Sequence, residues 1–195
     1  MNKIAHFLLF LMLAALGGCN SAAVQSPPLA GARMGGAFAL TNQDGKPVTD
    51  RDFAGRYRLI YFGYSFCPDV CPVDVQRLMQ GYSQFEKIDP VRAAKLQPIF
   101  ITVDPERDTP QKLKQFVGAF HPRLIGLTGS TAQIADVAKR YAVVFEKAAG
   151  GTADAYLVDH SRTAVLYGPD GAPIALIAQD GTPTAIATEF GKWIQ

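Results

Sequence analysis

Two apolar runs rich in β-branched and aromatic residues flank a segment with helical periodicity. The runs cover residues 57–64 and 96–103, and each suits a strand that is covered on both faces. Between them, apolar side chains recur at helical spacing from Pro72 to about Lys87, and proline is well placed at the first position of a helix. The pattern therefore predicts a strand–helix–strand unit with a buried sheet.

The remaining elements complete a predicted α/β domain. We expect helices at 109–120, 130–141 and 182–194, and hairpins that pair 38–41 with 46–48 and 163–167 with 173–177. A βαβ half followed by a ββα half is the order of a thioredoxin-like fold. The first hairpin is then an N-terminal β-hairpin added to that fold.

The composition fits one globular domain and excludes one class of partner. The chain has 195 residues, of which 48% are hydrophobic and 18% charged, so it can bury a sizeable core. Its formal net charge is +2, and neither sign is clustered into a run. We therefore expect no nucleic-acid binding, which requires a basic surface stripe.

The first residues, 1–18, have the three-part form of a secretory signal peptide. Lys3 precedes an apolar run at 4–16, which is shorter than the roughly 20 residues of a membrane-spanning helix. The letters LGGC at 16–19 resemble the bacterial lipobox, in which the cysteine is acylated and becomes the mature N-terminus. We therefore predict a lipoprotein with lipid on Cys19. An ordinary cleaved signal with an incidental cysteine is the alternative.

A flexible tether is expected at residues 19–36, because small residues, proline and glycine dominate there without an apolar period. Such a segment reaches roughly 20–25 Å. Residues 37–195 then form the folded domain. The predicted location is a bacterial cell envelope, where the lipid holds the domain at a membrane and the domain faces the periplasm.

Two cysteines follow the strand at 57–64, at the edge where α/β folds place ligands. We expect Cys71 to be the N-cap of the following helix and Cys67 to lie in the preceding loop. A helix N-terminus lowers the pKa of nearby thiols, so both should be reactive. The C-x-x-x-C spacing suits two sulfurs that hold one ion. A structural disulfide is the alternative in an oxidising compartment.

Two histidines remain in the predicted mature chain. His160 lies in the loop that leads into the strand at 163–167, and in a thioredoxin-like layout this loop faces the cysteine loop. Two thiolates and one imidazole suit Cu(I), and they could also hold Zn²⁺ with a water. A packing role is the alternative for His160. We expect His121, at the end of a helix, to be a surface residue.

Several stretches together resemble the Sco/SenC family of copper proteins. They are YFGYSFCPDVCP at 61–72, TVDPERDTP at 102–110, HPR at 121–123, GLTG at 126–129, VDHS at 158–161 and YGPDG at 167–171. The resemblance spans about 36–194. It implies a thioredoxin-like domain that binds copper through Cys67, Cys71 and His160, as Cu(I) with Cu(II) left open. It also implies a role in assembling the binuclear copper centre of cytochrome c oxidase.

The implied function is a metallochaperone, not an enzyme, that passes copper to cytochrome c oxidase subunit II. A periplasmic copper donor and a thiol reductant are its other expected partners. The alternative is a thiol–disulfide oxidoreductase in which Cys67 and Cys71 cycle, to reduce the oxidase cysteines or to remove peroxide. No proline lies between Arg123 and Gly168, where a plain thioredoxin has one next to its active site. We expect Asp104 and Asp108 to cap local backbone.

Overall fold

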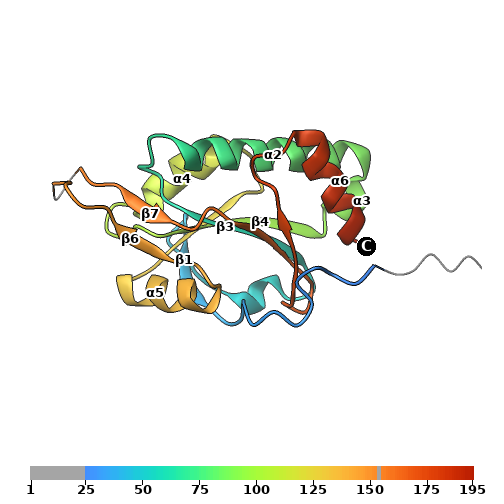
Figure 1. Ribbon diagram of the computed structural model, residues 1–195, viewed down its shortest axis with the longest axis horizontal. Helices are drawn as coiled ribbons and strands as arrows, with labels where there is room; N and C mark the ends of the chain where they lie inside the picture. The colour runs from blue at the N-terminus through green and yellow to red at the C-terminus, as the bar shows by residue number, and fades with distance from the viewer. Residues whose placement is uncertain (1–24, 153–154) are drawn as a thin grey trace, which may run out of the picture.

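A seven-stranded mixed sheet forms the centre of the structure, a computed structural model that describes residues 25–152 and 155–195 (Figure 1). The strand order is β2-β1-β5-β4-β3-β8-β9, and β6 and β7 form a separate two-stranded hairpin. The strands are β1 (Ala39–Asn42), β2 (Pro47–Thr49), β3 (Tyr57–Gly63), β4 (Leu96–Thr102), β5 (Ile125–Thr128), β6 (Phe145–Lys147), β7 (Val158–His160), β8 (Ala164–Tyr167) and β9 (Pro173–Ile177).

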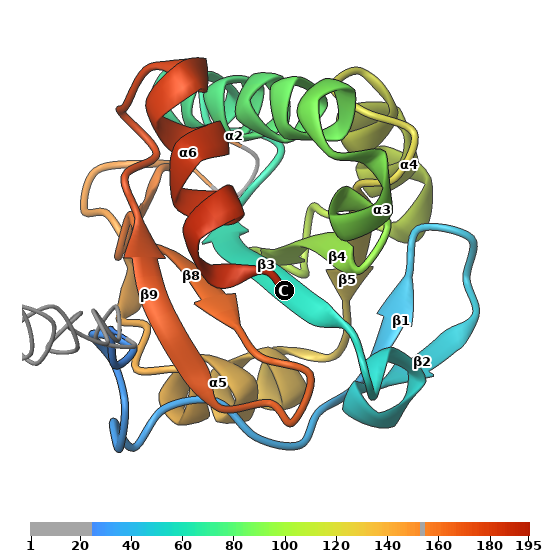
Figure 2. The same cartoon turned by 90° about the vertical axis from the view of Figure 1, so that its right-hand side faces the viewer.

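Helices cover both faces of this sheet, as Figure 2 shows. They are η1 (Asp50–Phe53), α2 (Val70–Ile88), α3 (Pro90–Ala93), α4 (Pro110–Gly118), α5 (Thr131–Arg140) and α6 (Pro183–Trp193). Because strand side chains alternate, Leu59 and Tyr61 pack with α2, α4 and α6, whereas Ile60 and Phe62 pack with α5. Among the described residues, no helix is long and apolar enough to cross a membrane.

The strand–helix–strand prediction is confirmed by β3, α2 and β4. Strands β3 and β4 are parallel, and Gly63 pairs with Thr102 at their carboxyl ends. On its other side β3 pairs antiparallel with β8. All seven residues of β3 and of β4 are buried, as expected of strands covered on both faces. The loops after β3 and β4 therefore lie next to each other.

The N-terminal hairpin is also confirmed, and it extends the central sheet. Strands β1 and β2 are antiparallel, and β1 joins the sheet by pairing antiparallel with β5. The sequence did not predict β5, α3 or the hairpin β6–β7. We expected His160 in a loop, which is wrong: it is the last residue of β7, opposite Phe145 of β6.

The start of α2 differs from the sequence expectation. The helix begins at Val70 with Asp69 as its N-cap, so Cys71 lies inside the first turn and is not the cap. Pro72 is the third helical residue rather than the first. Proline is tolerated there because the first N–H groups of a helix have no intrahelical partner.

The predicted signal peptide and lipidation site lie outside the described residues. Residues 1–18, Cys19 and the first part of the predicted tether, up to residue 24, belong to this undescribed part. The chain is described from Gln25, and the folded elements begin at Ala39.

Candidate functional site

The two cysteines lie where β3 passes into α2. Cys67 is in the loop and nearly buried, and Cys71 is in the first turn of α2 and has no exposed surface. The backbone N–H of Cys71 donates a hydrogen bond to Cys67 Sγ at 3.5 Å. Both cysteines are free thiols in the structure. The sequence prediction that the two sulfurs lie near each other at a helix start is therefore consistent with the geometry.

His160 reaches this pair from β7. Its Nε2 is 3.1 Å from Cys71 Sγ, and its Nδ1 is 3.1 Å from the carbonyl oxygen of Ser161. A carbonyl oxygen only accepts hydrogen bonds, so Nδ1 carries the proton and Nε2 directs its lone pair toward the thiol. The rings of Tyr61 and Tyr64 lie nearly perpendicular to the imidazole ring, with their centres 6.3 Å and 6.0 Å from its centre. This places one nitrogen donor directly against one sulfur donor.

A pocket of about 290 Å³ opens beside these side chains. Its lining includes Cys67 and His160, together with Asp69, Asp159 and the exposed Leu157. Within the described ranges, no three His, Cys, Asp or Glu side chains are grouped to hold a metal ion as they stand. The arrangement is therefore one sulfur–nitrogen pair, with a second sulfur beside it at the pocket.

The two thiols differ in acidity. Burial raises the pKa of Cys67, but hydrogen bonds from the N–H groups of Cys71, Asp69 and Val70 outweigh it, so the net shift is downward. Burial raises the pKa of Cys71 well above its usual value, and the nearby Cys67 and Asp74 raise it further. We expected both pKa values to be lowered, and for Cys71 this is wrong. It lies within the first turn, where burial outweighs the effect of the helix terminus.

The imidazole of His160 is held neutral. Its burial lowers the pKa, and this outweighs the hydrogen bond to Ser161 that acts in the opposite direction. A neutral imidazole keeps the Nε2 lone pair available near pH 7. Of the two thiols, Cys67 is the more readily ionised. The two cysteines therefore present one reactive sulfur, that of Cys67, at the pocket and one buried sulfur, that of Cys71, beneath it.

A buried carboxylate links the helix of Cys71 to the segment of His160. Asp74, one turn after Cys71, accepts a hydrogen bond from the Tyr61 hydroxyl at 2.8 Å. It also accepts from Arg162 Nη2 at 2.8 Å and from Arg162 Nε at 3.1 Å. Asp74 has no exposed surface. Because Arg162 is two residues after His160, this contact fixes the histidine relative to α2.

Sequence reasoning missed this contact between Asp74 and Arg162. The only signal was an aspartate among the apolar residues that recur along the predicted helix at 72–87. Its partner is 88 residues away in the chain, and no local pattern connects the two. The contact is set by the tertiary packing of α2 against the start of β8.

Asp108 fixes the start of the cysteine loop. It is fully buried and accepts hydrogen bonds from the backbone N–H and the hydroxyl of Ser65 and, at 2.6 Å, from Thr102 Oγ1. We expected Asp108 to cap local backbone, which is wrong: Thr109 caps α4 by accepting from Lys112 N. The physical reason is that Gly63 and Thr102 are paired, so the loop after β4 that carries Asp108 lies next to Ser65, two residues after the end of β3.

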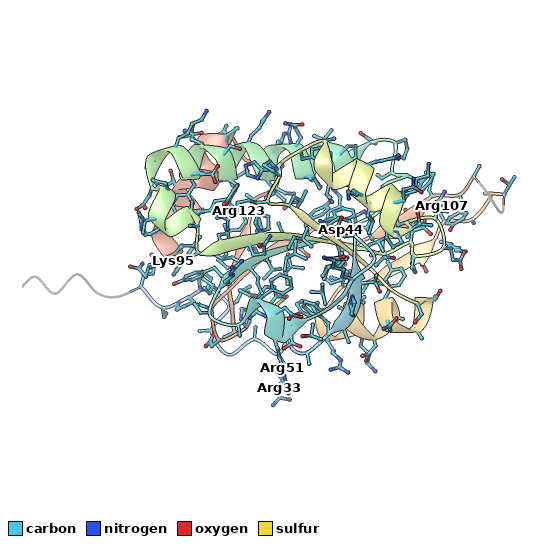
Figure 3. The ribbon with its side chains drawn as sticks, turned by 180° about the vertical axis from the view of Figure 1, so that it is seen from behind. Arg33, Asp44, Arg51, Lys95, Arg107 and Arg123 are labelled. Atoms are coloured by element: carbon cyan, nitrogen blue, oxygen red, sulfur yellow. The ribbon has the colours of Figure 1, made fainter. Side chains whose placement is uncertain are left out.

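Asp104 anchors the β6–β7 hairpin to the loop after β4. The Tyr156 hydroxyl donates to Asp104 Oδ1 at 2.6 Å, and Arg107 Nε donates to Asp104 Oδ2 at 2.5 Å. The Arg107 guanidinium lies over the Tyr156 ring, 3.6 Å from its centre, and Figure 3 labels Arg107 near this hairpin. A further bond runs from Val158 N to the Tyr64 hydroxyl. Together these contacts hold β7, and hence His160, over the cysteine loop.

His121 belongs to a different part of the molecule. Its ring packs perpendicular to Tyr82, with the ring centres 5.0 Å apart, and its Nε2 is 3.6 Å from Glu86. The side chain is only 10% exposed, so our expectation of a surface residue is wrong. The N–H of Arg123 donates to His121 Nδ1 and so orients the ring inward. The contacts of His121 are with α2 side chains remote from the cysteine loop.

Comparison with known proteins places this geometry in context. A family model described as SCO1/SenC matches residues 26–195. Among curated relatives, "Protein SCO1 homolog 1, mitochondrial" of Arabidopsis thaliana is 43% identical over 152 residues, which is 77% of this chain and 44% of that protein. The chain spans about half the length of the curated relatives it matches.

Solved structures share the fold as well. The structure of Bradyrhizobium japonicum ScoI with copper bound has a TM-score of 0.74 and 38% identity, and covers 82% of this chain and 99% of that one. The structure of BsSco, described as having a disulfide switch and as a member of the Sco family of cytochrome c oxidase assembly proteins, has a TM-score of 0.64 and 25% identity. That match covers 86% of this chain and 95% of BsSco.

Proposed function

The chain belongs to the SCO1/SenC family, and on that premise we propose that it is a metallochaperone for cytochrome c oxidase. It binds copper through Cys67, Cys71 and His160 and delivers it to the binuclear copper centre of oxidase subunit II. The observation that carries this proposal is the 3.1 Å approach of His160 Nε2 to Cys71 Sγ, with Cys67 beside them at the pocket.

The donor set fits copper as cargo. Thiolate sulfur and imidazole nitrogen are soft or intermediate ligands, and a set of three suits Cu(I), with Cu(II) as a second state that relies more on the imidazole. Nε2 is free to coordinate because Nδ1 donates to Ser161 O. The Cys71 thiol must lose its proton when copper binds, so loading releases protons. Cys67, which lines the same pocket as His160, supplies the second sulfur of the set.

Transfer of the cargo proceeds by ligand exchange at the pocket. Cys67 is the more readily ionised sulfur and lines the pocket, so an incoming thiol of the acceptor displaces it first. Cys71 and His160 hold the ion until the acceptor has formed its second bond. A periplasmic copper donor loads the site, and a thiol reductant keeps both cysteines reduced.

Membrane tethering is part of the same proposal. Lipid on Cys19 and the tether at 19–36 would hold the domain at a membrane of the bacterial envelope, facing the periplasm. The support is the LGGC sequence at 16–19 and the small, flexible residues that follow it. The acceptor subunit is itself a membrane protein in this scheme, so the tether raises its effective concentration near the copper site.

A second candidate function is thiol–disulfide exchange. The observation that favours it is the pairing of a low-pKa thiol, Cys67, with a buried thiol, Cys71. In this reaction the Cys67 thiolate attacks one sulfur of an oxidase disulfide and releases the other as a thiolate. Cys71 then loses its proton and attacks Cys67, which leaves a Cys67–Cys71 disulfide and a fully reduced oxidase pair. The two electrons come from the two cysteines.

The substitution His160→Ala distinguishes the two functions. It leaves both sulfurs, which can still hold Cu(I) in linear geometry, so Cu(I) affinity should fall moderately and the thiolate charge-transfer band of Cu(II) should fall far more. Disulfide exchange needs only the cysteines, so its rate should change little. The measurements are copper per chain after reduction, the visible spectrum with Cu(II), and oxidase assembly in cells.

The matched control is His121→Ala, which removes a histidine packed on Tyr82 and remote from the cysteines. It should leave copper per chain unchanged. If copper per chain, the Cu(II) band and oxidase assembly all stay at the wild-type level in His160→Ala, His160 is not a copper ligand and the chaperone proposal is wrong.

A further inference from the structure

A buried arginine lies at the opposite end of β3 from the cysteine loop. Arg58, the second residue of this strand, is only 5% exposed. Its one hydrogen bond among the described residues runs from Nη2 to the carbonyl oxygen of Gly168 at 3.2 Å, and its buried Nε has no partner there. Burying a guanidinium without an opposite charge is costly, so the position of Arg58 needs an explanation.

No carboxylate of the described chain is in direct contact with this charge. Within 4.0 Å, Arg58 forms no ion pair with any described carboxylate. The nearby Tyr141 and Tyr167 cannot supply a negative charge near pH 7, because burial raises the pKa of Tyr141 to about 12 and that of Tyr167 further. The positive charge of Arg58 is therefore available to a ligand.

A pocket of about 180 Å³ lies directly against Arg58. Its lining also includes Arg51 of η1, together with Asp50 and Asp170. Both of these aspartates already use one oxygen in local structure: Asp50 accepts from Phe38 N, and Asp170 accepts from Ala172 N. Figure 3 shows Arg51 on a different side of the molecule from Arg107, which marks the cysteine end.

The turn between β8 and β9 leaves space for the guanidinium. Gly171 has a φ of +88°, and a Cβ at this position would lie 2.8 Å from Arg58 Nη2. Glycine therefore allows the backbone of the turn to approach Arg58 closely. The pocket is thus formed by the turn, by η1, and by Gly36 and Ala37, where the predicted tether ends and the folded domain begins.

This pocket is separate from the cysteine site. At about 3.3 Å per residue, the five steps from Arg58 to Gly63 place them roughly 17 Å apart. The two pockets share no lining residue. A ligand at Arg58 would therefore leave the cysteines and His160 untouched.

We propose that this pocket binds a phosphate group, with Arg58 as its buried cation and Arg51 at its rim. A guanidinium pairs with phosphate oxygens through two parallel hydrogen bonds, which lysine cannot do. The two carboxylates in the lining favour a phosphate that carries an ammonium group, as phosphoethanolamine does. Such a group can come from a free phosphate ester or from a phospholipid headgroup.

The test measures the melting temperature of the purified full chain at constant ionic strength. The probes are inorganic phosphate, O-phosphoethanolamine as a free monoester, and glycerophosphoethanolamine as a lipid headgroup without acyl chains. A ligand that binds only the folded state raises the melting temperature, here by about 2–4 °C at saturation. The probe that acts at the lowest concentration identifies the source of the phosphate group.

Variants of Arg58 decide whether the shift comes from this pocket. Arg58→Leu should abolish the shift without lowering the melting temperature of the unliganded chain, because an apolar side chain replaces an unpaired buried charge. Arg58→Lys should weaken binding at least tenfold. The matched control, Arg56→Leu, removes an exposed arginine two residues away and should keep the full shift.

The results overturn the proposal in either of two ways. If none of the three probes shifts the wild-type melting temperature, Arg58 is balanced by Asp50 and Asp170 through solvent. If Arg58→Leu keeps the shift, the probes bind elsewhere. If Arg58→Leu fails to fold, the same probes are titrated into Arg51→Ala and into wild type, and binding is followed by phosphorus NMR. Loss of the rim arginine must weaken binding, so equal affinity in the two chains also overturns the proposal.

Discussion

Two sulfurs four residues apart differ in chemistry because one helical turn changes their surroundings. Cys67 precedes α2 and accepts hydrogen bonds from backbone N–H groups, which lower its pKa against the effect of burial. Cys71 lies inside the first turn, where the covering side chains leave it no exposed surface, and its pKa is raised. Burial thus gives the two thiols different reactivity. In the proposed copper site, Cys67 would exchange ligands with a partner and Cys71 would retain the ion.

The contact of Asp74 with Arg162 gives a prediction at the residue scale. Removing Arg162 leaves a fully buried carboxylate with only the Tyr61 hydroxyl as partner, whereas removing the Asp74 charge leaves an arginine whose side chain is 44% exposed. We therefore expect Arg162→Met to lower the free energy of unfolding by about 3 kcal/mol and Asp74→Asn by about 1–2 kcal/mol. Urea unfolding monitored by fluorescence measures both.

The matched control for this pair is Asp136→Asn, an exposed carboxylate paired with Arg140 on the surface of α5. It should change the free energy of unfolding by less than about 0.5 kcal/mol. Equal losses in Arg162→Met and Asp74→Asn would contradict the argument from burial. Both site variants should also weaken Cu(II) binding more than Cu(I) binding, because they loosen His160 rather than the cysteines.

At the scale of elements, the loop after β3 is fixed by its neighbour in the sheet. Because β3 and β4 are parallel and in register at Gly63 and Thr102, the chain after each strand arrives at the same edge. Asp108 uses this closeness to accept from Ser65 and Thr102 together. The cysteine loop is therefore held from the β4 side, and His160 is held from the β7 side.

The substitution Asp108→Asn tests this connection. An amide oxygen cannot accept all three hydrogen bonds, so the free energy of unfolding should fall by about 1–3 kcal/mol. Burial raises the pKa of Asp108, against hydrogen bonds that lower it, so the folded chain binds this proton more tightly than the unfolded chain. The contribution of Asp108 to the free energy of unfolding is therefore complete below its unfolded-state pKa of about 4. It is lost as pH rises from there through its higher pKa in the folded chain.

Urea unfolding at a series of pH values measures the difference in the free energy of unfolding between wild type and Asp108→Asn. This difference should become smaller as pH rises through this window. If it becomes larger instead, the pKa shift of Asp108 has the opposite sign. Thr109→Ala, which removes the cap of α4, is the control: it lowers stability at all of these pH values by a similar amount.

Periodic elements were predictable from the sequence, and the contacts between them were not. The runs that became β3 and β4 and the helix α2 carry a long, regular apolar pattern, and their ends were placed within about two residues. Strands β6 and β7 have three residues each and are partly exposed, so they leave no alternating pattern. The partners of Asp74 and Asp108 depend on which strands pair, which no local window contains.

The same limit applies to the candidate site. Cys67, Cys71 and His160 were named from spacing and from resemblance, and their roles as ligands stay a prediction. Spacing indicated that the sulfurs lie together, but it did not show that one turn separates a reactive thiol from a buried one. That difference comes from the side chains packed over Cys71, which belong to elements distant in the sequence.

At the scale of the whole molecule, the candidate copper site and the first segment of the described chain lie at opposite ends. In Figure 1 the chain enters on the side away from the β6–β7 hairpin. Near the Arg58 pocket, the N–H of Gly35 donates a hydrogen bond to the carbonyl oxygen of Arg140 at the end of α5. The Tyr141 hydroxyl donates one to the carbonyl oxygen of Gly36. A chain held through its N-terminus would therefore present the cysteine pocket outward, toward a partner.

The last prediction tests this arrangement through Cys19→Ser. Without the thiol no lipid can be attached, so the chain should move from the membrane fraction to the soluble fraction of the envelope. Copper per chain should not change, because the folded domain is intact, but oxidase assembly should fall several-fold with the loss of effective concentration near the acceptor.

Mass spectrometry of the wild-type chain should show a diacylglyceryl group on an N-terminal Cys19, and the tether variant Ser26→Ala should behave as wild type. A soluble wild-type chain cleaved elsewhere, or full membrane attachment of Cys19→Ser, would show that another feature holds this domain at the membrane.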